Sequence, residues 1–145
     1  MTTPSIECNF RVHGSPPYST IVVHGGPGAA GSVQLLAQGI AEKACFPSGV
    51  LEPFLTALSL DGQLAQLHDL ITTQATAPLV LIGHSFGAML GTMIAANHPK
   101  LVSRLILVGS GVFDEKHAGS IMETRLSRLT SKEKEEVEQL ITRLN

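Results

Sequence analysis

The chain has 145 residues, which is enough for one domain with its own core and too few for two ordinary domains. Hydrophobic residues make up 43% of the sequence and charged residues 15%, a composition that excludes a disordered chain. The net charge is −2 and the basic residues are scattered, so neither nucleic acid nor an acidic membrane surface is an expected partner.

The first third of the chain contains two predicted strands and a helix. Residues 6–14 are expected to form an antiparallel edge strand. Residues 19–25 are apolar and β-branched and end in glycines, which predicts a buried strand. A helix should follow, with Ser32 as its N-cap. The predicted apolar stripe of this helix consists of Val33, Leu36 and Ile40.

The strand and helix pattern then repeats. Residues 48–53 predict a weaker strand, and Ser59 is expected to cap a helix after it. Residues 77–83 predict a third strand, 86–97 its helix, and 104–109 a fourth strand. The stripe of the middle helix consists of Leu60, Leu64, Leu67 and Ile71. Apolar strands separated by helices predict an α/β fold, a doubly wound and mostly parallel sheet sandwiched by helices.

Residues 70–99 contain no Asp, Glu, Lys or Arg, so a membrane-spanning helix has to be weighed. Pro78 and three glycines interrupt this segment, which favours a strand, a turn and a buried helix. No membrane partner is therefore predicted. The N-terminal residues lack a basic segment followed by an apolar run, and we expect a cytoplasmic protein.

Composition changes near Asp114. Of the 22 charged residues, 13 lie between Asp114 and Arg143, where the pattern predicts two amphipathic helices. Thr130 and Glu133 match a capping box at the start of the second helix. The apolar stripe of that helix consists of Val137, Leu140, Ile141 and Leu144. We predict a division into residues 1–113 and 114–145.

A serine between glycines follows the third predicted strand, in the sequence GHSFG of residues 83–87. A buried strand before it and a helix after it are the context of a nucleophile elbow, which exposes the serine hydroxyl on a sharp turn. Helix N-H groups and the positive end of the helix dipole would point at the same place. We predict that Ser85 is a nucleophile; the alternative is a plain turn serine. His84 is expected to pack or to form hydrogen bonds rather than to act with Ser85.

A second glycine cluster, HGGPG at residues 24–28, ends an earlier predicted strand. Its N-H groups could complete an oxyanion hole with the N-H of Phe86. The cluster lacks the lysine of a phosphate loop and the spacing of a dinucleotide fingerprint, so no cofactor is expected. Cys8 and Cys45 have no metal-ligand spacing, and neither a metal site nor a disulfide is predicted.

The segments VVHGGPG, LIGHSFGAMLG and LILVGSG together resemble the α/β-hydrolase superfamily, particularly its prolyl-aminopeptidase-like and lid-bearing branches. The resemblance covers roughly residues 20–145. It implies the N-terminal part of an α/β-hydrolase fold, with Ser85 as nucleophile and the N-H groups of Gly26 and Phe86 as oxyanion donors. It also implies a structural role for His24 and the start of a helical lid after residue 113.

The sequence departs from this superfamily in two places. Many relatives carry an Asp-x-Arg-Gly-x-Gly turn where this chain has GVLEPFLTALSLDG, with Glu52 the acid nearest that strand. Relatives also carry the triad acid and histidine beyond the lid, and the chain is expected to end before them. Asp114 and His117 are the candidates for acid and base in this chain; the alternative is a polar surface at a lid hinge.

These observations predict a serine hydrolase that cleaves an ester, thioester or amide of a small molecule or peptide by acyl transfer through Ser85, incomplete in this chain. The alternative is a catalytically inactive, truncated hydrolase or an interaction module. The strand at 104–109 would be an exposed apolar sheet edge, which favours a homo-oligomer.

Overall fold

A computed structural model describes residues 9–43 and 49–144. The chain divides into two units, with the boundary between Gly111 and Val112, and each unit is described by itself. Cys8 and Cys45 lie outside the described residues.

The first unit is built on a five-stranded sheet with the strand order β1-β3-β2-β4-β5. Strand β1 pairs antiparallel with β3, and the other neighbouring strands are parallel. The strands are β1 (Asn9–His13), β2 (Tyr18–Val23), β3 (Gly49–Phe54), β4 (Leu79–His84) and β5 (Val102–Val108). The predicted fold class is confirmed, including the antiparallel edge strand, whose residues 6–8 lie outside the described part.

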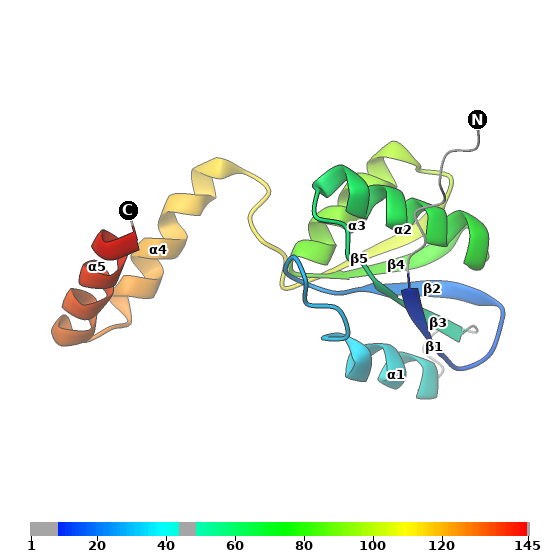
Figure 1. Cartoon of the computed structure of the whole chain (residues 1–145), viewed down its shortest axis with the longest axis horizontal. Helices are drawn as coiled ribbons and strands as arrows, with labels where there is room; N and C mark the ends of the chain where they lie inside the picture. The colour runs from blue at the N-terminus through cyan, green and yellow to red at the C-terminus, as the bar shows by residue number, and fades with distance from the viewer. Residues whose placement is uncertain (1–8, 44–48, 145) are drawn as a thin grey trace. The chain divides into compact units, whose positions relative to one another are not determined.

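Helices cover both faces of this sheet, α2 and α3 on one face and α1 on the other (Figure 1). They are α1 (Gln34–Glu42), α2 (Leu60–Gln74) and α3 (Phe86–Asn97). The predicted cap of α2 is confirmed, because Ser59 Oγ accepts a hydrogen bond from the Gly62 N-H at 3.1 Å. The predicted cap of α1 is wrong: Ser32 lies in a run of turns, and Val33 takes the N-cap position without a side-chain bond.

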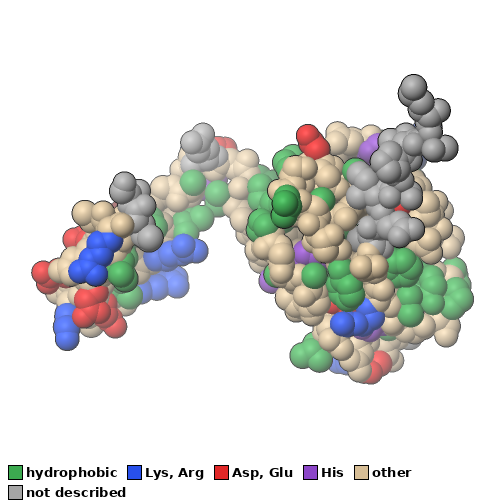
Figure 2. Space-filling view, viewed as in Figure 1, with side chains coloured by type: hydrophobic (Ala, Val, Ile, Leu, Met, Phe, Trp, Pro, Cys, Tyr) green, Lys and Arg blue, Asp and Glu red, His purple; other side chains and the backbone are tan. Residues whose placement is uncertain are grey.

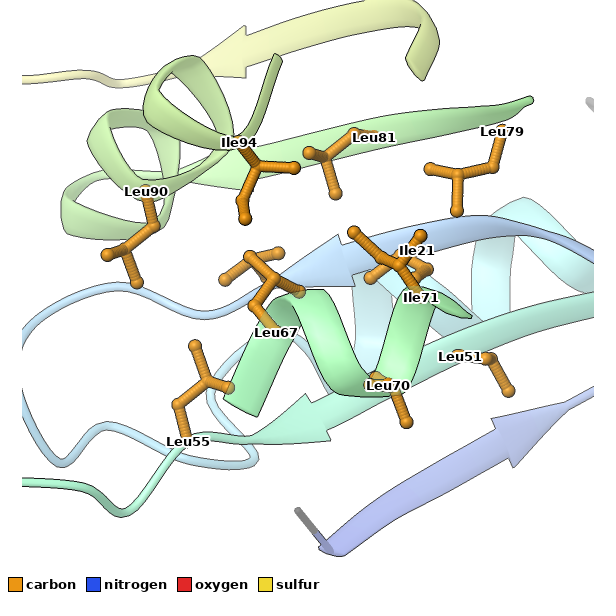
Figure 3. Packing of buried hydrophobic residues seen from close by; sticks show 11 residues of the cluster. Ile21, Leu51, Leu55, Leu67, Leu70, Ile71, Leu79, Leu81, Leu90 and Ile94 are labelled. Carbon is orange, nitrogen blue, oxygen red and sulfur yellow. The ribbon is translucent and has the colours of Figure 1, made fainter. Parts of the chain in front are cut away.

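The period of two along each strand gives the sheet two apolar faces. On the α2 and α3 face, leucine and isoleucine side chains from β2, β3 and β4 point toward those from the two helices (Figure 3). On the α1 face, Val22, Val50 and Ile82 pack against Val33 and Ala37. The alternation explains why neighbouring residues such as Ile21 and Val22 are both fully buried.

The helical stripes predicted from the sequence are only partly buried. Leu67 and Ile71 of α2 are buried as expected, but Leu60 is 42% exposed. Gln63 and Gln66 are buried in the same helix. In α1, Val33 is buried while Leu36 is exposed, and Ala37 takes its place in the core. Each helix is therefore rotated slightly from the orientation that its largest apolar residues predict.

The segment without charges forms β4, a turn and α3, as the sequence predicts. Among the described residues, no helix is long and apolar enough to cross a membrane.

The second unit contains a short 3-10 helix, Glu115–His117, followed by α4 (Ala118–Ser127) and α5 (Ser131–Leu144). The predicted capping box is present: Glu133 Oε2 accepts from the Thr130 N-H at 2.8 Å and from the Thr130 hydroxyl at 2.7 Å. Lys, Arg, Asp and Glu side chains gather on these helices (Figure 2). None of the unit's described side chains is buried, and the role of a lid stays a prediction.

Candidate active site

Ser85 lies at the turn between β4 and α3, where a buried strand leads directly into a helix. Its backbone has φ 52° and ψ −116°, and within the described ranges no other non-glycine residue has a positive φ. This conformation is costly for a residue with a side chain, and such strain concentrates at functional sites. The Ser85 N-H donates to the Val108 carbonyl at 2.9 Å, so the neighbouring strand β5 holds the turn in place.

The two glycines of the GHSFG sequence are required by close backbone contacts. A Cβ at Gly83 would lie 2.5 Å from the Ala88 Cα and would also meet the Gly87 carbonyl. A Cβ at Gly87 would collide with the carbonyls of Val23 and His24 at the end of β2. Only glycine at both positions lets α3 begin this close to β4 and β2.

The second glycine cluster reaches the same turn. A Cβ at Gly25 would lie 2.9 Å from the Ser85 Cβ and 2.9 Å from the His84 Nδ1. The loop after β2 is therefore packed directly against Ser85, as the parallel arrangement of β2 and β4 requires. The structure brings together the two motifs that the sequence predicts to meet at one edge of the sheet.

His24 fixes the shape of this loop. Its side chain is buried; Nε2 accepts a hydrogen bond from the Leu55 N-H at 3.2 Å, and Nδ1 lies 3.0 Å from the Gly25 carbonyl oxygen. Because Nε2 is the acceptor, the proton of the neutral ring is on Nδ1 and is donated to the Gly25 carbonyl. His24 thus links the loop after β2 to the end of β3, which agrees with the structural role expected for it.

The two predicted oxyanion donors belong to the loop after β2 and to the start of α3. Gly26 has φ 45°, and its N-H donates to none of the described residues. Phe86 is the first residue of α3, in the turn whose N-H groups find no acceptor within the helix. Their role as oxyanion donors near the Ser85 hydroxyl stays a prediction.

The other predicted residues near the motif are placed as follows. His84 is partly buried, with its ring near Gly25 and Gly109, and its buried Nδ1 has no partner among the described residues. Asp114 and His117 belong to the second unit. The Asp114 carboxylate accepts from the Lys116 N-H at 3.1 Å and pairs with the Lys116 Nζ at 2.6 Å, and His117 is exposed. Their roles as acid and base stay predictions.

Glu52 is fully buried on β3. Its Oε2 lies 2.9 Å from the His13 Nε2 and 3.2 Å from the Arg11 Nη1, both on the edge strand β1. Glu52 therefore joins β1 to the sheet rather than contributing to the turn at Ser85.

Sequence reasoning missed two buried glutamines of α2. Gln66 Oε1 accepts from the N-H groups of Thr56 and Ala57, both at 3.0 Å. Gln63 Nε2 donates to the Ala57 carbonyl at 2.9 Å. Glutamine on a helix usually indicates a solvent-exposed face. The available signal for burial was the position of both glutamines close to Leu67 on the helix.

Metal ligands do not gather in the part of the chain that the structure describes: no group of three or more His, Cys, Asp or Glu side chains is arranged to hold an ion.

Comparison with known proteins places the chain in a family. Residues 54–136 match the alpha/beta hydrolase fold family. A segment of 60 residues is 32% identical to the lipase LipV of Mycobacterium tuberculosis and covers 41% of this chain and 23% of the lipase.

Two solved structures share the fold of this chain. The thioesterase domain from the curacin biosynthetic pathway is 31% identical, with a TM-score of 0.62 over 84% of this chain and 49% of that domain. Proline iminopeptidase from Mycobacterium smegmatis has a TM-score of 0.71 at 17% identity, over 92% of this chain and 52% of that enzyme.

The fold is that of an α/β hydrolase, and the chain belongs to the alpha/beta hydrolase fold family. It spans about half the length of the solved structures it matches, and less of the lipase.

Proposed function

We propose that this chain carries the nucleophile and the oxyanion hole of a serine hydrolase that cleaves an ester, thioester or amide by acyl transfer. The observation that carries the proposal is the strained turn at Ser85, packed against the loop of Gly25 and Gly26. The lipase and the thioesterase domain, each more than 30% identical over the aligned part, support the ester and thioester classes.

In the proposed reaction a base removes the Ser85 hydroxyl proton while Oγ forms a bond to the substrate carbonyl carbon. The carbonyl oxygen becomes an oxyanion, to which the N-H groups of Gly26 and Phe86 donate. The oxyanion then collapses, the leaving group departs with the proton from the base, and water hydrolyses the acyl ester on Ser85. Within this chain, His117 is the candidate for the base, and Asp114 is the candidate for the acid that orients it.

The test is hydrolysis of an activated aryl ester by the purified chain and by Ser85→Ala, His117→Ala and Ser127→Ala. Ser127 is an exposed serine of α4 and serves as the matched control. Loss of a complete triad lowers turnover about a million-fold. Turnover abolished by Ser85→Ala and His117→Ala would establish a self-contained site. Turnover abolished by Ser85→Ala alone would place the base elsewhere.

Turnover that Ser85→Ala leaves unchanged would contradict the proposed nucleophile. Hydrolysis by the wild-type chain no faster than the uncatalysed background would instead favour the second candidate function, a non-catalytic interaction module. The observation in its favour is that, among the described residues, no side chain forms a hydrogen bond with the Ser85 hydroxyl.

A further inference from the structure

A cavity of about 370 Å³ lies beside the glycine loop. Pro27, Gly28 and Ala30 of that loop form one side, and residues 55–58 with Gln63 form the other. Cavities of this size hold small-molecule ligands or parts of larger ones. The cavity is bordered by the segment directly after β3.

Three buried polar side chains hold the β3 side of the cavity. His24 accepts from the Leu55 N-H, Gln66 accepts from the N-H groups of Thr56 and Ala57, and Gln63 donates to the Ala57 carbonyl. Burying a polar side chain is unfavourable unless its hydrogen bonds are made. Here these bonds are made to the backbone of three consecutive residues, so the backbone of residues 55–57 is held in place while the Leu58 side chain is not.

Gln63 has one polar atom left over. Its side chain is 5% exposed, and its buried Oε1 has no hydrogen-bond partner among the described residues. The orientation of the amide is set, because exchanging its oxygen and nitrogen would place two oxygens together at the Ala57 carbonyl. A buried acceptor without a donor is costly, and a donor that reaches it is correspondingly favoured.

The cavity lies close to Ser85 along the loop. Gly25 is packed against Ser85, and Pro27, two residues further on, lines the cavity. Two consecutive Cα steps span at most about 7.6 Å. A substrate whose carbonyl lies at Ser85 therefore needs only a few additional atoms to enter the cavity.

The lining decides the chemistry of the occupant. Pro27, Ala30, Leu55 and Leu58 are apolar, and no charged side chain of the described residues lines the cavity. A charged group would lose its hydration there without gaining a partner. The lining therefore selects a neutral, mainly apolar group.

We propose that this cavity binds the non-reacting end of the substrate, a small neutral apolar group that carries one N-H or O-H donor, with Gln63 Oε1 as the acceptor. The proposal rests on the proposed function and adds the substrate class. Because Gln63 Oε1 is buried, the donor of the ligand reaches it only when side chains that line the cavity move. The Leu58 side chain at that wall is 105% exposed and is not restrained by packing.

The experiment measures binding rather than hydrolysis, in the Ser85→Ala chain, so that it does not depend on the chemistry at Ser85. N-methylpropionamide, which has one N-H, is compared with N,N-dimethylpropionamide, which has none. Backbone amide NMR signals of Gly28 and of residues 56–58 report binding. One hydrogen bond at Gln63 should make the secondary amide about threefold to tenfold tighter.

Three variants test the assignment. Gln63→Met keeps the length of the side chain and should abolish the preference, whereas Gln74→Met, at an exposed glutamine of the same helix, should leave it unchanged. Ala30→Leu fills the cavity from the opposite side without touching Gln63 and should weaken both amides at least tenfold. This variant keeps the proposal testable if Gln63→Met does not fold.

Equal affinity for the two amides, a preference that survives Gln63→Met, or no perturbation of residues 56–58 would each overturn the proposal. If Ser85 proves not to be a nucleophile but the amide preference is found, the cavity stands while the proposed function fails. If Ser85 proves to be the nucleophile but the amide preference is not found, the proposed function stands while the proposed ligand of the cavity fails.

Discussion

The two units of this chain are stabilised in different ways. The first contains every buried residue that the structure describes, including a core of leucine, isoleucine and valine on both faces of the sheet. The second has more than half of the chain's charged residues, and none of its described side chains is buried. Its helices are held by local bonds such as the capping box at Thr130.

The difference shows where a site can be fixed. A strained residue such as Ser85 persists only where the surrounding structure determines its conformation, and in the first unit β2, β5 and α3 all contact its turn. A helix cap such as the one in the second unit contributes only about 0.5–2 kcal/mol. Any precise chemistry is therefore expected to be positioned by the first unit.

The largest expected effect is on the core of the first unit. Leu81→Ala removes a fully buried side chain from β4 and should lower the free energy of unfolding by about 2–5 kcal/mol. Leu140→Ala, at a leucine of α5 that is 56% exposed, should change it by less than about 1 kcal/mol. Urea unfolding followed by far-UV circular dichroism measures the free energy of unfolding of both variants. Equal losses would show that α5 is as well packed as the core.

A smaller effect is expected from the buried glutamines. Gln66→Met leaves the Thr56 and Ala57 N-H groups without their acceptor and should cost about 1–3 kcal/mol. Gln139→Met, at an exposed glutamine of α5, should fall within about 0.5 kcal/mol of the wild type. The same unfolding measurement compares them. A neutral Gln66→Met would mean that the segment after β3 is not held as described.

The strand and helix order of the first unit could be predicted from the sequence, because buried parallel strands are continuous apolar runs and their helices repeat at 3.6 residues. The start of α1 could not. Ser32 is a good N-cap by type, but the turns after Gly26 delay the helix to Gln34. Leu60 was placed in the core by spacing alone, and the rotation of α2 that buries Gln63 instead depends on contacts distant in sequence.

The turn at Ser85 could be predicted because its glycines follow from close contacts that any such turn requires. The cavity wall could not, since it depends on glutamines six to ten residues away in sequence that bond to the backbone after β3. Their spacing next to Leu67 places these glutamines near the buried side of α2, but glutamine as a residue type is mostly exposed.

The edge of the sheet in the first unit is also expected to bind a second copy of the chain, which the second unit is not. β5 ends the strand order and pairs with β4, and Leu107 on it is 43% exposed. An apolar edge with unpaired backbone groups favours pairing with another chain, so we propose that the chain self-associates there. Leu107→Lys should weaken association about tenfold, or about 1.4 kcal/mol, in sedimentation velocity.

Leu140→Lys on α5 is the matched control for the edge and should leave association unchanged. If it weakens association as much as Leu107→Lys does, the apolar stripe of α5 is the contact instead of β5. A wild-type chain that sediments as a monomer at micromolar concentration would contradict self-association altogether.

The smallest expected effect lies at the start of α5. The Thr130 N-H and then the Thr130 hydroxyl hold the pKa of the exposed Glu133 carboxyl below its usual value. A lowered pKa means that the folded helix binds the proton less tightly than the unfolded chain, so the stabilisation is fully present above the usual glutamate pKa and is lost as the pH falls through the lowered one.

Carbon-13 NMR titration of the Glu133 carboxyl measures this pKa in the whole chain. Thr130→Val removes the hydroxyl but keeps the N-H, so it should raise this pKa only partway toward the usual value. Glu133→Gln still accepts from the Thr130 N-H and should remove the pH dependence that Glu133 gives to the Thr130 amide signal. If Thr130→Val leaves the titration unchanged, the hydroxyl bond contributes nothing in solution, and the cap depends on the backbone N-H alone.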